Sequence, residues 1–256
     1  MKNEIPIALQ LYSIREDCAE RGLPAVLEEV AQMGYDGVEF AGYHGMSAKA
    51  LRAELDKNGL KVAGTHTKLP DLLGDALLPT LDFNREIGNR YVICPGLPEE
   101  YRDSLDAWEK TAGLFNELSE KLAAHDMMVG YHNHTHEFVP IDGVLPWDVF
   151  YGNTRKEVIM QLDTGNALAG GMDVAPFIEK YPNRSITVHL KERALEGDTK
   201  AVIGDGDVNW SEIFRLCEEI GGTKWYIVEQ ESYAHPPMEC VRICLERVRG
   251  MLEARK

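Results

Sequence analysis

The feature that most constrains this chain is a repeated alternation of short apolar segments with longer segments of helical period. Eight segments rich in Val, Ile and Tyr are typical of buried strands, at residues 7–12, 37–40, 61–65, 91–94, 127–131, 158–162, 186–189 and 225–229. Segments with a helical apolar stripe fall between them, at residues 23–32, 47–58, 78–87, 104–125, a short piece from 147, 174–180, 210–220 and 237–254. The chain therefore repeats a strand–helix unit.

This repeat implies parallel strands joined by right-handed crossovers. Eight units in 256 residues favour a closed (β/α)8 barrel, whereas six strands would suit an open sheet. No predicted strand leads into a GxGxxG or GxxxxGK[ST] motif, so neither a dinucleotide site nor a P-loop is indicated. Because no stretch has the composition of a linker, we predict one α/β TIM-barrel domain over residues 1–256.

The charge balance excludes several classes of partner. Lys plus Arg is 27 and Asp plus Glu is 42, which gives a formal net charge of −15. Such a chain repels nucleic-acid phosphates and anionic lipid, and no segment approaches the roughly 20 apolar residues of a membrane span. The five cysteines show no CxxC spacing, and the first residues do not resemble a secretory signal. We expect a cytoplasmic protein with reduced thiols. The sequence is compatible with a homo-oligomer and does not determine the oligomeric state.

Polar residues follow four consecutive strands of the predicted barrel. The fifth strand runs into the sequence HNHTHE at residues 132–137, and Asp163, His189 and Glu229 end the sixth, seventh and eighth strands. In a TIM barrel the chemistry lies at these carboxyl ends, so the groups are expected to converge. Carboxylates and imidazoles without thiolates are typical of a divalent-metal site, and they favour Mn, Co, Zn, Fe or Mg over a structural zinc.

Each of these residues also has a structural interpretation. Asp163 precedes Thr-Gly-Asn and is a plausible helix cap, and His189 is a plausible hydrogen-bonded core histidine. Glu229 is harder to explain in this way, because an ionised carboxylate at the end of a buried strand needs a partner. Glu39 and His66, at the ends of the second and third strands, fit a supporting contact, a substrate contact or a structural role equally well. The joint placement favours the metal site.

Several motifs resemble a known family. They are Gly37-Val38-Glu39-Phe40, Tyr131-His132-Asn133-His134, Leu162-Asp163-Thr164-Gly165-Asn166, His189-Leu190-Lys191 and Ile203-Gly204-Asp205-Gly206-Asp207. Together they resemble the xylose-isomerase-like TIM-barrel superfamily of sugar phosphate isomerases and epimerases. Its members include ketose 3-epimerases, hydroxypyruvate isomerase, inosose dehydratases and endonuclease IV. The resemblance runs from residue 9 to residue 231 and implies a small-molecule carbohydrate substrate.

The resemblance implies one divalent ion held by Glu, Asp, His and Glu from strands 5 to 8. Asp163, His189 and Glu229 match three of these positions, whereas the fifth strand lacks the family glutamate at its end. We expect Glu137 as the fourth ligand, because a doubly charged ion favours a third carboxylate. His132 and His134 are the alternatives at that position.

The resemblance also implies proton abstraction next to a carbonyl, through an enediolate, with the metal as Lewis acid. His134 or His132 is the expected general base, since an unperturbed imidazole has a pKa of about 6.5. Glu229 is expected to act as a ligand and second acid or base, and Lys191 to stabilise the enolate oxygen or a hydroxyl. Substrate contacts are expected from Glu39, His66 and Asn166.

We therefore expect a divalent-metal-dependent isomerase or epimerase acting on a sugar, a keto-sugar or a sugar phosphate. A keto-sugar or inosose dehydratase on the same site is the alternative, because β-elimination shares the first step. Phosphodiester hydrolysis as in endonuclease IV is disfavoured by the net charge of −15 and by the small number of histidines at strands 2, 3 and 7. A non-catalytic sugar-binding barrel predicts no metal and no turnover.

Overall fold

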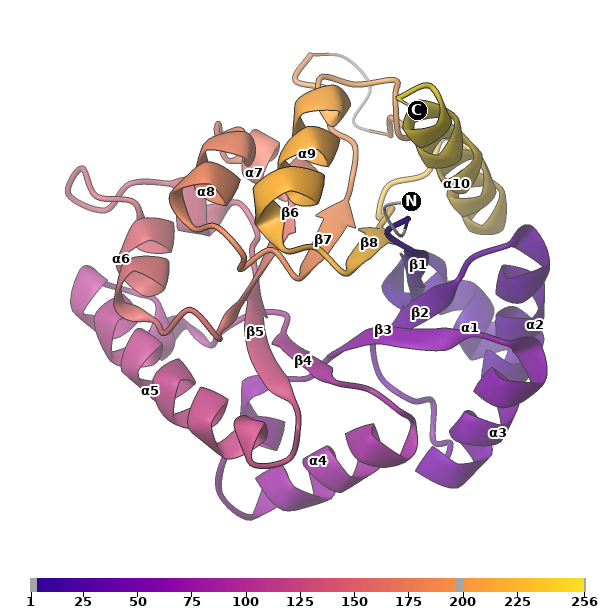
Figure 1. Cartoon of the computed structure of the whole chain (residues 1–256), viewed down its shortest axis with the longest axis horizontal. Helices are drawn as coiled ribbons and strands as arrows, with labels where there is room; N and C mark the ends of the chain where they lie inside the picture. The colour runs from indigo at the N-terminus through magenta and orange to yellow at the C-terminus, as the bar shows by residue number, and fades with distance from the viewer. Residues whose placement is uncertain (1–3, 197–199, 256) are drawn as a thin grey trace.

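A computed structural model describes residues 4–196 and 200–255 of the chain, and in it the strands form a closed parallel barrel surrounded by helices (Figure 1). The strands are paired in chain order, and the last pairs with the first. They are β1 (Ile7–Gln10), β2 (Gly37–Phe40), β3 (Lys61–His66), β4 (Tyr91–Cys94), β5 (Met128–His132), β6 (Ile159–Asp163), β7 (Thr187–Leu190) and β8 (Trp225–Val228). The predicted (β/α)8 barrel is confirmed.

The helices form the outer layer of the barrel (Figure 1). Those predicted from the sequence are α2 (Leu23–Met33), α3 (Ala48–Asn58), α4 (Leu77–Glu86), α5 (Leu105–Ala123), α6 (Pro146–Asn153), α8 (Ala175–Lys180), α9 (Trp210–Leu216) and α10 (Pro237–Glu253). Two short helices, α1 (Arg15–Arg21) and α7 (Thr164–Ala169), were not predicted. Each has seven residues or fewer, and α1 buries only Cys18, so neither shows an apolar stripe.

Local sequence explains where these elements begin and what they bury. Ser104 precedes α5, and its hydroxyl accepts a hydrogen bond from the Ala107 backbone N–H, which satisfies one free donor of the first turn. Trp108, Phe115 and Leu122 then form a buried stripe along α5. The strands are buried on both faces, inward into the barrel and outward against helices. This double burial explains their continuous apolar character.

The loop between β7 and α9 is organised by one buried carboxylate. Glu192 accepts hydrogen bonds from the backbone N–H groups of Gly204 and Val208 and from the indole N–H of Trp210. Gly206 lies against the Arg193 carbonyl, where a Cβ atom would come within 2.5 Å of the oxygen. The Gly-Asp-Gly segment of this loop is therefore needed for close backbone packing beside the barrel mouth.

The remaining sequence expectations concern the thiols and the membrane. All five cysteines are buried as free thiols. In the ranges that the structure describes, no helix combines the length and apolar character needed to cross a membrane.

Candidate active site

Four side chains from adjacent strands meet inside the carboxyl end of the barrel. His132 ends β5, Asp163 ends β6, His189 lies in β7, and Glu229 directly follows β8. All four are buried, and one ligand atom of each lies within 4.8 Å of the others. Nδ1 of His189 is 3.0 Å from Oε2 of Glu229 and 3.9 Å from Oδ2 of Asp163. The structure thus brings Asp163, His189 and Glu229 together and adds His132; we call these residues the four-residue cluster.

Two buried atoms of the four-residue cluster lack a hydrogen-bond partner. Asp163 caps α7 through Oδ1, which accepts a hydrogen bond of 2.6 Å from the Asn166 backbone N–H. Its other oxygen, Oδ2, is buried without a hydrogen-bond partner, and so is Nδ1 of His132. Buried polar atoms are nearly always satisfied, so these two point to a missing ligand. Two carboxylates and two imidazoles are a donor set that suits a divalent ion.

Glu137 is not part of this cluster. Its Oε1 accepts a short hydrogen bond from the hydroxyl of Tyr131, and its Oε2 accepts one of 2.8 Å from the backbone N–H of His134. Nε2 of His136 lies 2.9 Å from Oε1, which places Glu137 in a separate group with His134 and His136. The carboxylate holds the loop after β5 together. The geometry therefore places Glu137 apart from Asp163, His189 and Glu229, and His132 lies with those three residues instead.

Glu39 lies beneath His189 and away from the cavity. Its Oε2 is 2.5 Å from Nε2 of His189 and accepts a hydrogen bond of 2.7 Å from Nε2 of Gln10. Its Oε1 accepts one of 2.8 Å from Nε2 of Gln161. A metal-binding histidine commonly gives its second ring nitrogen to a carboxylate, which fixes the orientation of the ring. The supporting role considered for Glu39 fits this geometry, and the expected substrate contact does not.

His66 connects the buried network to the cavity. Its Nε2 lies 2.9 Å from Oε1 of Gln161 and 3.2 Å from Oε2 of Glu39. Its ring stacks on that of His189 at a centroid distance of 5.2 Å and tilts against that of His132 at 5.0 Å. His66 therefore forms the side of the four-residue cluster that faces β3.

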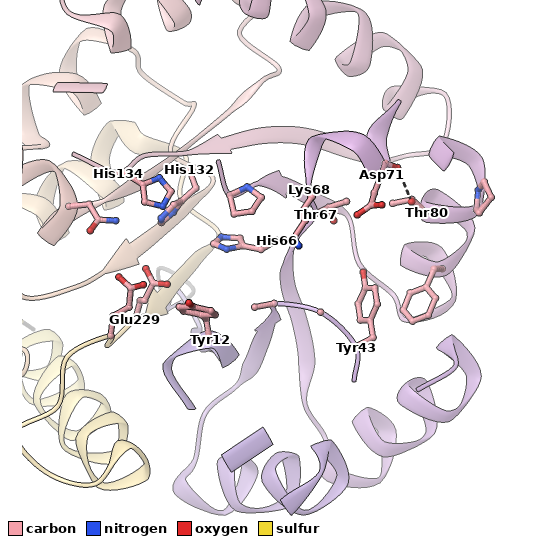
Figure 2. Close-up of a pocket in the computed structure, with 17 residues that line it drawn as sticks. Tyr12, Tyr43, His66, Thr67, Lys68, Asp71, Thr80, His132, His134 and Glu229 are labelled. Carbon is pink, nitrogen blue, oxygen red and sulfur yellow. Dashed lines mark hydrogen bonds between the residues drawn. The ribbon is translucent and has the colours of Figure 1, made fainter. Parts of the chain in front are cut away.

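A cavity of about 820 Å³ opens at the carboxyl end of the barrel (Figure 2). This volume lies within the usual range for small-molecule sites. Several expected site residues line it, namely His66, His132, His134, Asn166 and Glu229. Lys191 is not among the lining residues, although Glu231, to which its ammonium group is hydrogen-bonded, is. Lys191 lies behind the carboxylates, with Nζ 3.8 Å from Oε2 of Glu229.

The acidic and basic side chains in and around the cluster strongly shift one another's pKa values. Burial alone lowers the pKa of His189, but the carboxylates of Glu39 and Glu229 outweigh burial and raise this pKa to about 10. Burial alone raises the pKa of Glu229, yet Lys191 and His189 hold that pKa well below its usual value. Burial raises the pKa of Asp163 well above its usual value, and the Glu229 carboxylate adds to this effect. Without a metal the cluster therefore retains protons.

The pKa values of His132 and His134, at the carboxyl end of β5, are lowered. Burial lowers the pKa of His132 well below its usual value, and the nearby charge of His189 lowers it further. Burial also lowers the pKa of His134, against the opposing effect of Glu137. Both imidazoles are therefore neutral at pH 7. A neutral imidazole has a free electron pair, which either a metal or a substrate proton can take.

Several polar residues that shape this site were not predicted from the sequence. Gln10 and Gln161 are completely buried in the barrel interior, where they hold Glu39. Gln161 precedes Asp163 by two residues, so strand periodicity places both on one face, and this signal was available. Asn133 fixes the end of β6, because its Oδ1 accepts a hydrogen bond of 2.8 Å from the Asp163 backbone N–H.

Comparison with known proteins identifies relatives that share most of the chain. The rhizopine catabolism protein MocC of Rhizobium meliloti is 25% identical over 90% of this chain and 82% of that protein. The inosose dehydratase of Erwinia tasmaniensis is 24% identical over 90% of this chain and 91% of that enzyme. A solved sugar phosphate isomerase/epimerase from Parabacteroides distasonis is 25% identical, with a TM-score of 0.79 over 96% of this chain and 94% of that one.

A family model confirms the resemblance seen in the motifs. The model described as xylose isomerase-like TIM barrel matches residues 27–247, which include every member of the four-residue cluster. The match covers most of the chain and all but the first of its strands. This protein therefore belongs to the xylose isomerase-like TIM barrel family.

Proposed function

We propose that the four-residue cluster binds one divalent metal ion, with Mn, Co, Zn, Fe and Mg as the candidates. The observation that carries this proposal is a pair of buried ligand atoms without a hydrogen-bond partner, Oδ2 of Asp163 and Nδ1 of His132. Nδ1 of His189 and Oε2 of Glu229, 3.0 Å apart, complete the set. When bound there, such an ion supplies Lewis-acid polarisation of a substrate carbonyl.

The reaction that we propose begins with removal of a proton from the carbon next to the keto group of a carbohydrate. His134 is the proposed base, because it lines the cavity and its lowered pKa keeps it neutral. The C–H electron pair moves into the new carbon–carbon double bond, and the carbonyl pair moves onto the keto oxygen. His66 and Asn166 line the same cavity and are proposed to hold substrate hydroxyls.

Elimination of water is the outcome that the site supports best. His134 returns the proton to a β-hydroxyl, the oxygen pair of the enolate re-forms the carbonyl, and the enolate double-bond pair moves between the α and β carbons as the β carbon–oxygen bond breaks. Water leaves with the electron pair of that bond, so the substrate becomes an α,β-unsaturated keto-sugar plus water. Epimerisation by two carboxylates would need a strand-5 glutamate at the cluster, where this chain has His132. The inosose dehydratase relative, 24% identical, also supports elimination. The expected isomerase or epimerase activity is the second candidate, favoured by the likeness to the solved isomerase/epimerase.

Solvent exchange tests this proposal. Metal-loaded protein incubated in D2O with inososes, ketoses and 3-keto-glycosides should place deuterium next to the carbonyl of at least one compound, detectable by NMR and mass spectrometry. Loss of 18 mass units would identify dehydration, and a changed sugar without mass loss would identify isomerisation. A His134→Gln variant should lose about 100-fold or more of the exchange rate. Absence of exchange with every compound would reject the mechanism.

Metal binding is expected to release protons, and this prediction follows from the pKa shifts. His189 has a pKa of about 10 without metal and Asp163 has a raised pKa, whereas a ligand must be deprotonated. At pH 7 we expect between about one and two protons to be released per ion. The apparent affinity should therefore rise with pH from 7 and level off above about 10, where His189 is already neutral.

Calorimetric titration in two buffers of different ionisation enthalpy measures this release directly. A Glu39→Gln variant serves as the comparison, because loss of that carboxylate lowers the pKa of His189 and should reduce the release at pH 8 to 9. A binding enthalpy that is the same in both buffers, together with an affinity that does not change between pH 7 and 9, would contradict the protonated cluster.

A further inference from the structure

The cavity extends well beyond the four-residue cluster. His66, His132, His134 and Glu229 lie toward one end, and Tyr43, Asp71 and Thr80 lie toward the other (Figure 2). The cavity volume of about 820 Å³ is several times that of one sugar ring, which fills roughly the space of six waters at about 30 Å³ each. One ring at the cluster therefore leaves the far end vacant for another group.

The far end is built by loops from the other half of the barrel. Tyr43 follows β2, Lys68 and Asp71 follow β3, and Phe83 lies in α4, whereas the cluster comes from β5 to β8. The rings of Tyr43 and Phe83 stack at a centroid distance of 4.1 Å and an interplanar angle of 28°. Both rings line the cavity and are packed against the hydrophobic core. They form a fixed aromatic wall, a surface that suits the apolar face of a second ring.

The path between the two ends is kept open by small residues. Ala41 and Gly42 line the cavity between β2 and Tyr43. Gly42 has a φ of +89°, and a Cβ atom built there would meet nothing within 4 Å. No side chain at position 42 therefore divides the cavity, and a substrate can reach from the cluster to Tyr43.

The charges of the cavity disfavour a phosphorylated substrate. Its charged lining includes Asp71, Glu229 and Glu231 as carboxylates but only Lys68 as a lysine, and the described lining contains no arginine. Lys191 does not line the cavity, and its ammonium group is hydrogen-bonded to Glu231. A phosphate dianion is held by several arginines or lysines or by a helix N-terminus, whereas the far end of this lining offers only Lys68, and the Asp71 carboxylate opposes it. Neutral hydroxyl groups suit the carboxylate and ammonium groups at the far end.

We infer that this cavity takes a neutral, unphosphorylated glycoside with two rings. The reacting ring lies at the four-residue cluster, and the second ring, a sugar or an aryl group on the glycosidic oxygen, packs against Tyr43 and Phe83. Asp71 and Lys68 bind its polar substituents. The inference rests on the proposed function for the identity of the reacting end.

Binding of matched ligands tests the inference without requiring turnover. Calorimetry with metal-loaded protein compares methyl β-D-glucopyranoside, which has one ring, with 4-nitrophenyl β-D-glucopyranoside and cellobiose, which have two. We expect the better two-ring ligand to bind about tenfold more tightly than the methyl glycoside. The two arms distinguish an aryl from a sugar second ring. Glucose 6-phosphate should bind no more tightly than the methyl glycoside.

Variants assign the preference to the aromatic wall. Tyr43→Ala should abolish the two-ring advantage, and Phe83→Leu, which keeps the bulk of the side chain, should reduce it. Leu78→Ala is the control, because Leu78 lies in α4, is 58% exposed and does not line the cavity. A thermal unfolding curve for each variant shows whether it is folded.

Three results would overturn the inference: equal affinity for one and two rings in the unmodified protein, no binding of any glycoside, or an advantage that survives both wall substitutions. Tighter binding of glucose 6-phosphate would reject the neutral substrate. Failure of the proposed function has a different signature, in which the two-ring preference is present but no keto-sugar exchanges deuterium.

Discussion

Replacing Asp163 with asparagine is expected to lower the affinity for the divalent ion by more than about 100-fold while the barrel stays folded. Asparagine is as good a helix cap as aspartate, so the hydrogen bond that Oδ1 accepts from the Asn166 backbone N–H is retained. The substitution removes the negative charge of the carboxylate, whose Oδ2 is buried without a hydrogen-bond partner. Metal content by mass spectrometry, affinity by calorimetry and thermal unfolding measure these effects together.

The matched control for this variant is Asp173→Asn. Asp173 lies two residues before α8, and its Oδ1 accepts a hydrogen bond of 2.9 Å from the Ala175 backbone N–H, but it is exposed and outside the four-residue cluster. It should bind metal as the unmodified protein does. Undiminished metal binding by Asp163→Asn would show that Asp163 serves only as a cap.

Replacing Glu39 with glutamine is expected to lower the metal affinity about 10- to 100-fold, although Glu39 is not a ligand. The carboxylate orients His189 through a contact of 2.5 Å, and it is completely buried. The substitution also leaves the buried imidazolium with one carboxylate fewer, which should cost the metal-free protein about 3 kcal/mol of unfolding free energy at pH 7. Calorimetry and chemical denaturation measure the two effects.

The loss of stability should depend on pH. Because the pKa of His189 is raised from 6.5 to about 10 on folding, its ion pairs contribute stability that is fully present below pH 6.5 and lost as pH rises through 10. The difference between Glu39→Gln and the unmodified protein should therefore shrink above pH 10. An exposed change, Glu20→Gln, is the control. A raised KM for substrate with unchanged metal affinity would instead assign Glu39 to substrate binding.

Strand positions could be predicted closely because each strand is buried on both faces and therefore forms an uninterrupted apolar segment. The first strand is the main exception. Residues 7–12 were predicted, but β1 ends at Gln10, whose side chain accepts a hydrogen bond from the Tyr12 backbone N–H and starts a 3₁₀ helix. An apolar pattern does not report such a side-chain bond, so the end of the strand was missed.

The positions of site residues could be predicted where a residue ends a strand, and less well where the conformation of a loop sets the position of the side chain. The barrel itself carries Asp163 and His189 to one place, since both lie in strands whose register is fixed by pairing. Glu137 follows β5 on a loop, and its position depends on the bond with Tyr131 and the backbone of His134. The expectation that a doubly charged ion favours a third carboxylate pointed to Glu137 as a ligand, but the loop places its side chain next to His134 and His136. The aromatic wall was also missed, because Tyr43 lies on the loop after β2 and Phe83 lies in α4, so neither belongs to a strand.

The most direct test of the metal proposal is anomalous diffraction from crystals soaked in Mn²⁺ or Zn²⁺. We predict one strong anomalous peak at about 2.0–2.3 Å from atoms of His132, Asp163, His189 and Glu229. A peak between His134, His136 and Glu137 instead, or no peak at saturating metal, would contradict it.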